Sequence, residues 1–260
     1  MLRKKIVVVP EIFDTWLLVM LRVTAIILVV PIFSSRGIPV KIRMALAGFT
    51  AAAITPTIPP ISLESLPFIQ VILVMSLEVL CGLLLGFVAR IFFYGLDLAG
   101  ALIATQMGLM MSNDINPYQQ EQASLPSLIL YHLAVFLFFS LNLHHWFFMG
   151  VYQSYDSVPV GAGMVTEALI DNLIQWTGGI FLVGVQIAGP IVAISFILLL
   201  TFSFLGRAVP QMNVFSESFS VRIIVGLLTL GTSCELMSKQ IADYLRGIPT
   251  DMFKAINLFR

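Results

Sequence analysis

Charged side chains are scarce in this sequence. Only 11% of the 260 residues are charged, whereas a soluble globular domain carries about 25%. The sequence is 58% hydrophobic, its mean hydropathy is +0.97, and its apolar runs are long and continuous. Such runs predict membrane helices and not the short alternating strands of a membrane barrel. We therefore predict an all-α membrane protein.

The sequence also lacks the patterns of catalysis, metal binding and nucleic-acid binding. The two cysteines, Cys81 and Cys234, lie in apolar helical sequence, which favours buried free thiols over a disulfide or a metal site. The three histidines have no G-x-S-x-G or H-E-x-x-H context. The net charge is zero, which gives no indication of a nucleic-acid partner. We predict no enzymatic activity, no cofactor and no metal.

Basic residues are absent from one long stretch. Residues 91–206 contain no lysine or arginine, although six acidic residues fall there: Asp97, Asp114, Glu121, Asp156, Glu167 and Asp171. Because short loops rich in lysine and arginine stay in the cytoplasm, we predict a cytoplasmic C-terminal tail. The same rule places the middle third of the chain on the opposite side or in an enclosed lumen.

Six apolar segments supply the predicted helices: 16–33, 44–61, 66 to beyond 100, 125–150, 180–205 and 221–230. The third segment exceeds the roughly 20 residues that cross a bilayer once, so we expect it to break or bend back near residues 93–95. Gly82 and Gly86 in that segment allow close helix packing. Pro190 predicts a kink in the fifth segment.

The C-terminal tail, residues 235–260, is charged and amphipathic. Phe253, Ile256 and Phe259 recur there at helical spacing among the charged residues. This pattern predicts a helix that lies on a membrane surface or binds a partner.

Arg22 lies in the middle of the first apolar segment. An arginine at that depth costs about 2.5–3.5 kcal/mol on insertion scales. We therefore expect its side chain to face protein, and snorkelling to an interface is the alternative. Glu78 and Arg90, spaced widely in the third segment, are further charges in apolar sequence.

A polar decapeptide, residues 206–215, reads G-R-A-V-P-Q-M-N-V-F and interrupts the apolar sequence. Pro210 lacks an N–H and clashes with the preceding turn, so the helix should end or kink near Val209. The carbonyl groups freed there need donors within the protein. Three side chains of the decapeptide supply them: Arg207, Gln211 and Asn213. A short loop at the membrane surface is the simpler interpretation of the same composition.

Residues 107–123 form an unusual loop with a methionine-rich front and a polar rear. Three methionines fall within five residues, at Met107, Met110 and Met111, beside the small residues Gly100 and Gly108. Methionine fits irregular contours because it is unbranched and polarisable. The loop is therefore either a deformable plug or a water-exposed connector.

The decapeptide resembles the signature of the FliR/SctT family, the export-gate proteins of the bacterial flagellum and of type III secretion systems. The resemblance extends over most of the chain, in the same order and spacing. It includes Arg22 with Pro31; Ile38, Pro39, Lys41 and Arg43; Glu78, Gly82, Gly86 and Arg90; Gly100, Gln106 and Gly108; Leu143, His144 and His145; and Pro190. Residues 219–231 resemble the flagellar members of this family more than its virulence-secretion members.

This resemblance implies that residues 1–260 form a single export-gate subunit in the bacterial inner membrane, at the flagellar basal body. Its partners would be FliP-, FliQ- and FlhB-like membrane proteins, membrane lipid and unfolded export substrates. The fold would consist of tilted helical hairpins with kinked and broken helices, assembling with partners into a helical pore complex. Most of that complex would be held above the bilayer plane.

The resemblance also implies roles for individual residues. Residues 107–122 correspond to the loop that plugs the pore in this family. We therefore expect the pore plug to include Met107, Gly108, Met110, Met111, Asn116 and Pro117. Polar residues in apolar sequence would contact neighbouring subunits: Arg22, Glu78, Arg90, Arg207, Gln211 and Asn213.

Two other functions compete with an export gate. A small-solute secondary transporter or channel would suit broken helices with polar residues, but the two halves of the sequence show no inverted repeat. An intramembrane hydrolase needs a nucleophile, a base and an orienting group, and the histidine contexts do not supply them.

Overall fold

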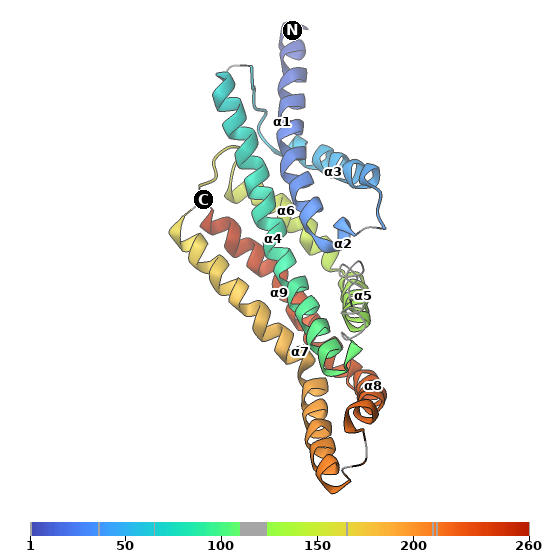
Figure 1. Ribbon diagram of the computed structural model, residues 1–260. Coiled ribbons are helices and arrows are strands. Elements are labelled where there is room, and N and C mark those ends of the chain that lie inside the picture. Colours follow the sequence, from blue (N-terminus) through green and yellow to red (C-terminus); the bar gives the residue numbers. More distant parts are fainter. Residues whose placement is uncertain are drawn as a thin grey trace. The chain divides into compact units, whose positions relative to one another are not determined.

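The computed structural model describes the backbone of residues 2–35, 37–64, 66–109, 124–164, 166–209, 211 and 213–259, and the side chains from residue 10 on except at 214 and 215. These residues form helices and no strand (Figure 1). The helices are α1 (Leu2–Val29), α2 (Pro31–Ser34), α3 (Val40–Ile54), η1 (Thr55–Thr57), α4 (Phe68–Gln106), α5 (Leu125–Ser140), α6 (Leu143–Ser157), α7 (Glu167–Ala208), α8 (Val214–Thr232) and α9 (Cys234–Leu258).

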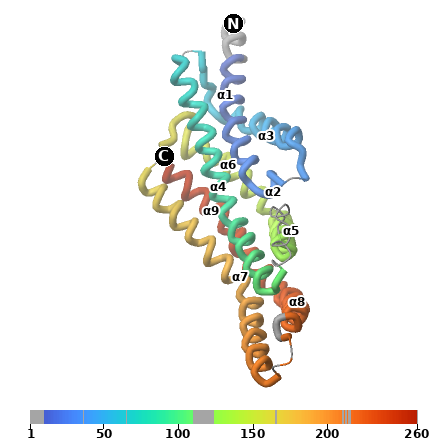
Figure 2. Tube along the Cα trace, in the orientation of Figure 1, coloured from blue at the N-terminus to red at the C-terminus, as the bar shows by residue number. Residues whose placement is uncertain are grey.

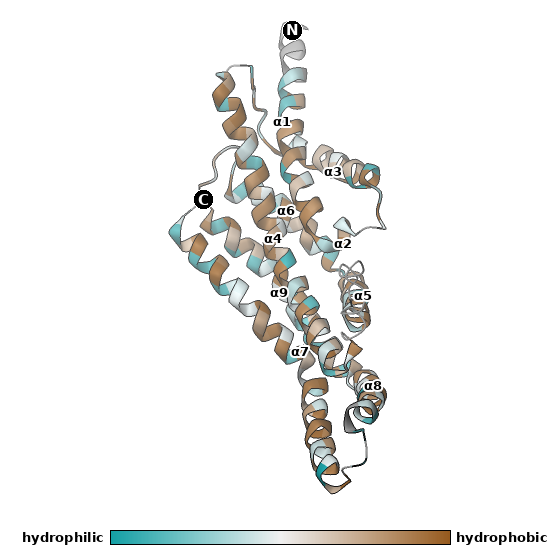
Figure 3. Ribbon diagram, in the orientation of Figure 1, coloured by the Kyte–Doolittle hydropathy of each residue, from teal (hydrophilic) through white to brown (hydrophobic). Residues whose placement is uncertain are grey.

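Three of these helices are long and apolar enough to cross a membrane: Pro10–Val29 within α1, Phe68–Gln106 and Glu167–Ala208. Two helix pairs qualify when each is taken as one broken span, namely α5 with α6, bent by 76°, and α8 with α9, bent by 59°. Figure 3 shows apolar residues dominating α4, α5 and α7. The predicted all-α membrane fold with broken helices is confirmed, and its assembly with partners stays a prediction.

The helices break at positions other than those that the sequence predicts. α4 runs without interruption for 39 residues, so the predicted break near residues 93–95 is wrong. Gly95 does not open the helix there, because it packs against Val183 of α7. The segment predicted as one helix at 125–150 instead breaks between α5 and α6. Asn142 there has φ 55°, a left-handed conformation that asparagine tolerates better than most residues.

Contacts divide the chain into two compact units, and the backbone can be followed through both in Figure 2. The first comprises Met1–Ile91, Asn142–Trp176 and Gly247–Arg260. The second comprises Phe92–Leu141 and Thr177–Arg246. α4, α7 and α9 therefore contribute residues to both units.

In the first unit, α1 packs against α3 and the segment that follows it. The indole N–H of Trp16 donates to the carbonyl oxygen of Gly48 at 3.3 Å. The Asp14 carboxylate accepts the backbone N–H of Leu63 at 2.9 Å, and the Thr15 hydroxyl accepts the backbone N–H of Ile61 at 2.8 Å. These bonds fix the chain after α3 along the N-terminal half of α1.

The C-terminal end of the tail packs within the same unit. The carbonyl oxygen of Phe259 accepts the backbone N–H of Met164 at 2.8 Å, and its ring lies where a side chain at Gly163 would be. Met252 of α9 is buried against Gly150 of α6. The tail is helical and amphipathic as the sequence predicts, and its apolar residues Met252 and Phe259 are buried within this chain. Binding to a membrane surface or a partner stays a prediction.

In the second unit, small residues let α4 approach its neighbours closely. A Cβ atom at Gly100 would come 2.6 Å from the backbone nitrogen of Ser127 in α5. One at Gly184 of α7 would come 2.8 Å from a methyl group of Leu98. The small-residue stripe of the third apolar segment therefore packs as the sequence predicts.

Candidate functional site

An ion pair between Arg22 of α1 and Glu78 of α4 lies at the centre of the first unit. The two side chains meet in a bidentate arrangement, Nε to Oε2 at 2.8 Å and Nη2 to Oε1 at 2.9 Å. Both side chains are almost completely buried. Paired N–H···O bonds of this kind are the strongest that proteins form between side chains.

Residues of α6 and the turn that follows it complete the network. Nη1 of Arg22 donates to the hydroxyl of Ser154 at 3.1 Å, and both Nη atoms donate to the carbonyl oxygen of Val158 at 3.2 Å. Oε1 of Glu78 also accepts the backbone N–H of Gly161 at 2.9 Å. Every one of the five N–H donors of a guanidinium thus has an acceptor.

An aromatic ring covers the guanidinium. Cζ of Arg22 lies 4.1 Å from the centroid of the Tyr155 ring, within the range of a cation–π interaction. The Tyr155 hydroxyl donates to the carbonyl oxygen of Val19 at 3.3 Å. The Tyr155 side chain of α6 therefore contacts α1 twice, through its ring at Arg22 and through its hydroxyl at Val19.

Two glycines of α4 bring the ion pair together. A Cβ atom at Gly82 would come 2.7 Å from Cβ of Ala25 and closer still to the Arg22 carbonyl oxygen. One at Gly86 would come 2.7 Å from Cβ of Val29. The predicted close packing at this pair of glycines is confirmed, and it lets the short Glu78 side chain reach the guanidinium.

The network is chemically closed. Its charges are balanced, its donors are occupied, and its members are buried, so it presents no group to a substrate. Such an arrangement fixes the positions of α1, α4, α6 and the turn 158–161 relative to one another. Arg22 faces protein as the sequence predicts. The prediction of inter-subunit contacts for Arg22 and Glu78 differs from the structure, which gives both residues partners within the chain.

The other predicted contact residues do not take part in the hydrogen bonds of this network. Arg90 is half-buried and donates to the carbonyl oxygen of Val29 at 3.4 Å. α7 ends at Ala208, as Pro210 predicts, and Arg207 in its last turn is exposed. Gln211 is exposed too.

Asn213 acts as an acceptor at the start of α8, and its role as a donor to the freed carbonyl groups stays a prediction. Its Oδ1 accepts the backbone N–H of Ser216 at 3.4 Å at the start of α8. This is the helix-capping role that asparagine favours. Pro210 and Met212 of the decapeptide lie outside the described residues.

Of the predicted plug residues, Met107 and Gly108 are described. Met107 is fully buried and fills the space above Gly226 of α8, where a Cβ atom would come 2.6 Å from Cγ of Met107. Gly108 follows with φ +78°, a value that glycine adopts without strain, and it lies against the ring of Phe219. Met110, Met111, Asn116 and Pro117 lie outside the described residues.

Comparison with known proteins gives a consistent result. The family model described as "Bacterial export proteins, family 1" matches residues 13–248. The flagellar biosynthetic protein FliR of Buchnera aphidicola subsp. Acyrthosiphon pisum is 30% identical over 211 residues, 81% of this chain and 81% of that protein. FliR of Bacillus subtilis (strain 168) is 30% identical over 224 residues, 85% and 86% of the two chains.

The chain belongs to the FliR family of bacterial export proteins. FliR of Escherichia coli (strain K12) is similar too, at 27% identity over 240 residues that cover 90% of this chain and 92% of that protein. The relatives are named for flagellar biosynthesis and not for a catalysed reaction. Membership makes this chain a component of the flagellar export apparatus, and its apolar helices make it a membrane protein.

The range matched by the FliR family contains the whole ionic network and the decapeptide. Sequence reasoning identified Arg22 and Glu78 but missed Ser154, Val158 and Gly161 as their partners. The signal available was that Arg22 has no acidic residue in its own apolar segment and Glu78 has no basic residue within ten positions of it. Pairing the two charges would have brought α1 and α4 together, but nothing in the sequence marks a serine hydroxyl and a backbone carbonyl in α6 and its turn.

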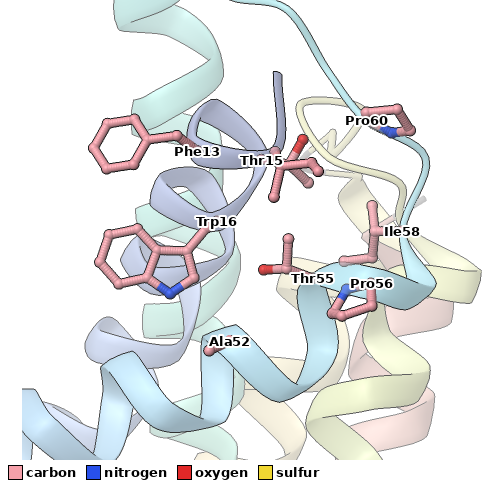
Figure 4. Close-up of a pocket in the computed structure, with 9 residues that line it drawn as sticks. Phe13, Thr15, Trp16, Ala52, Thr55, Pro56, Ile58 and Pro60 are labelled. Carbon is pink, nitrogen blue, oxygen red and sulfur yellow. The ribbon is translucent and has the colours of Figure 1, made fainter. Parts of the chain in front are cut away.

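A crevice of about 650 Å³ in this FliR-family chain lies between α1 and the end of α3 (Figure 4). Phe13 and Trp16 form one wall, and Pro56 and Ile58 form the other. Two threonines also line it. The Thr15 hydroxyl donates to the carbonyl oxygen of Glu11 at 2.8 Å, and the Thr55 hydroxyl donates to that of Ala51 at 2.7 Å. The crevice is therefore an apolar surface, and no predicted site residue lines it.

The two cysteines differ in their surroundings. Cys81 is buried and free as predicted, whereas Cys234 is exposed, which makes that part of the prediction wrong. Cys234 is the first residue of α9, at the bend after α8, where few residues surround it. Within the described part of the chain, no group of three His, Cys, Asp or Glu side chains is placed to hold a metal ion.

Proposed function

We propose that this protein is a non-catalytic subunit of the flagellar protein-export gate. With FliP- and FliQ-like partners, and joined by an FlhB-like one, it forms a gated channel through which unfolded protein substrates pass. The family match over residues 13–248 carries this proposal. The gate lies in the bacterial inner membrane at the flagellar basal body, with the C-terminal tail in the cytoplasm, because basic residues are concentrated at the chain ends.

Residues 107–122 act as the plug of this channel. The segment begins where Met107 is held by α8 and ends just before Ser124, whose hydroxyl donates to the carbonyl oxygen of Gly100 at 3.3 Å. Both ends are therefore anchored on helices of the second unit. Met110 and Met111 close the passage by adaptable apolar contact, since a hydrophobic constriction excludes water, and Asn116 and Pro117 belong to the same plug segment.

The exposed polar residues Arg207, Gln211 and Asn213, together with Arg90, contact neighbouring subunits. Exposed polar groups between apolar helices favour protein or water over lipid as their surroundings. Arg22 and Glu78 serve the assembly indirectly, by holding the helices of this subunit in register.

Isolation of the intact assembly tests the proposal. Extraction of the tagged chain in mild detergent is expected to yield a large complex that contains other small export-apparatus membrane proteins, identified by mass spectrometry. A stable monomer that moves a labelled small solute into liposomes would instead establish the transporter alternative.

Deleting residues 110–117 tests the plug. When the variant is co-expressed with its partners, we expect the bacterial membrane to become leaky to ions, because the apolar constriction is gone. The measurement is membrane conductance or collapse of the membrane potential. A matched control replaces the same residues with a Gly/Ser linker of equal length, which should leak as well. Unchanged conductance in both variants would remove the plug assignment.

A further inference from the structure

α7 and α9 form a polar cavity in the second unit. Its volume is about 410 Å³, and it is lined by Gln186 of α7 and by Gln240, Asp243 and Tyr244 of α9. Gln186 lies within the candidate membrane span Glu167–Ala208. A cavity lined only by polar side chains is unexpected on so apolar a helix.

The hydrogen bonding of this cavity is incomplete. The Tyr244 hydroxyl donates to Oε1 of Gln186. Oε1 of Gln240 is buried and has no hydrogen-bond partner, and a buried acceptor left unmatched is costly. The Asp243 carboxylate lies 3.7 Å from Nη1 of the exposed Arg246, which is beyond hydrogen-bond distance. The cavity therefore presents one buried amide oxygen without a partner, beside an exposed carboxylate that is held only by a long ion pair with Arg246.

Apolar residues continue the surface along α7 on the same side as Gln186. Helical spacing places Leu182, Ala193, Ile197 and Phe204 on that side, and all four are exposed. Gly189, one turn after Gln186, has open space where a side chain would be. A neighbouring helix can therefore approach this face closely.

Neither water nor lipid suits this face as a whole. Water would solvate the acceptors but would leave a contiguous row of exposed aliphatic and aromatic side chains, which marks an interaction site in soluble surroundings. Hydrocarbon would solvate that row but would leave the exposed Asp243–Arg246 ion pair and the Gln240 amide oxygen without polar surroundings. A protein surface with apolar residues around one cationic donor satisfies both.

We propose that this face of α7 and α9 docks a helix of another export-apparatus subunit, and that an arginine or lysine of that helix enters the cavity to bind Asp243 and Gln240. The inference rests on the proposed function and adds to it the location and the chemistry of one contact between subunits. Arginine suits the cavity best, because its fork of donors reaches a carboxylate and an amide oxygen together.

Charge reversal at Asp243 tests the inference. In the tagged full chain co-expressed with its partners, Asp243→Lys is expected to reduce the recovery of partner subunits about tenfold, because like charges at an interface are strongly unfavourable. The matched control is Glu235→Lys in the same helix, an exposed carboxylate outside the cavity, which should leave recovery unchanged. The isolated Asp243→Lys chain should unfold like wild type, since Asp243 is exposed.

A photoreactive side chain at Ala193 identifies the occupant. We expect it to crosslink to a helix of a different subunit. Crosslinks only to lipid or only to a second copy of this chain would overturn the inference, and so would full recovery of partners with Asp243→Lys. Absence of partners from the wild-type preparation would instead overturn the proposed function, so the two failures are distinguishable.

Discussion

Replacing Arg22 with leucine is expected to destabilise the chain by about 3–5 kcal/mol, the usual cost of removing one partner from a buried ion pair. The substitution leaves the buried Glu78 carboxylate with the Gly161 N–H as its remaining donor in the network. It also leaves the Ser154 hydroxyl and the Val158 carbonyl without the guanidinium. Loss of register among the helices should in turn weaken assembly. Thermal unfolding of the detergent-purified chain, followed by tryptophan fluorescence, measures the first effect.

A double variant makes this prediction specific. Arg22→Leu combined with Glu78→Leu removes both charges, and apolar replacement of a whole buried pair is often tolerated. We expect the double variant to recover part of the lost stability, although Gly161 and Val158 still lack partners. An exposed pair on α9, Lys239 with Glu235, provides the control, because Lys239→Leu should have little measurable effect. Strictly additive losses in the double variant would show that Arg22 and Glu78 are not coupled.

Adding a single methyl group at Gly82 is expected to separate α1 from α4. A Cβ atom there would meet the Arg22 backbone and Cβ of Ala25, and neither can rotate away as a flexible side chain could. Overpacking of this kind costs about 1–3 kcal/mol. Gly82→Ala should therefore lower the unfolding temperature and the yield of folded protein, although alanine is the better helix former.

Gly178 of α7 gives the matched control for Gly82. It lies inside a long helix like Gly82, but no atom beyond its own stretch of helix backbone lies within 4 Å of its Cβ position. Gly178→Ala should stabilise the isolated chain by up to about 1 kcal/mol, the helix-propensity gain. Similar unfolding temperatures for the two alanine variants would contradict the close approach of α1 and α4.

The sequence predicted the elements of this fold better than their breaks. Long apolar runs identify membrane helices because hydrophobic content is a local property of the chain. The continuity of α4 past Gly95 is different, because it depends on Val183 of α7, nearly ninety residues away in the sequence. The break at Asn142 depends on one residue that adopts a left-handed conformation, and an asparagine in apolar sequence only weakly indicates it.

The candidate sites divide in the same way. A lone arginine in an apolar helix must find partners, so Arg22 was predictable as a functional or structural residue. The identity of the partners was not, because Arg22 also binds the Ser154 hydroxyl and the Val158 carbonyl oxygen, and Glu78 also binds the Gly161 N–H. Two of these three partners act through backbone atoms. The methionine cluster predicts Met107 as a plug residue, which stays a prediction, whereas its packing against Gly226 of α8 could not be predicted from the sequence.

The order of biosynthesis gives the ionic network a further consequence. Arg22 leaves the ribosome long before the turn at 158–161 that accepts two of its hydrogen bonds. At about 5–20 residues per second, the guanidinium waits on the order of ten seconds for its full set of acceptors. The first helix therefore carries an unmatched cation in apolar sequence until Glu78 follows, and three of the guanidinium N–H groups lack their acceptors until the second half of the chain arrives. Insertion of that helix into lipid is accordingly more favourable once the second half has been made.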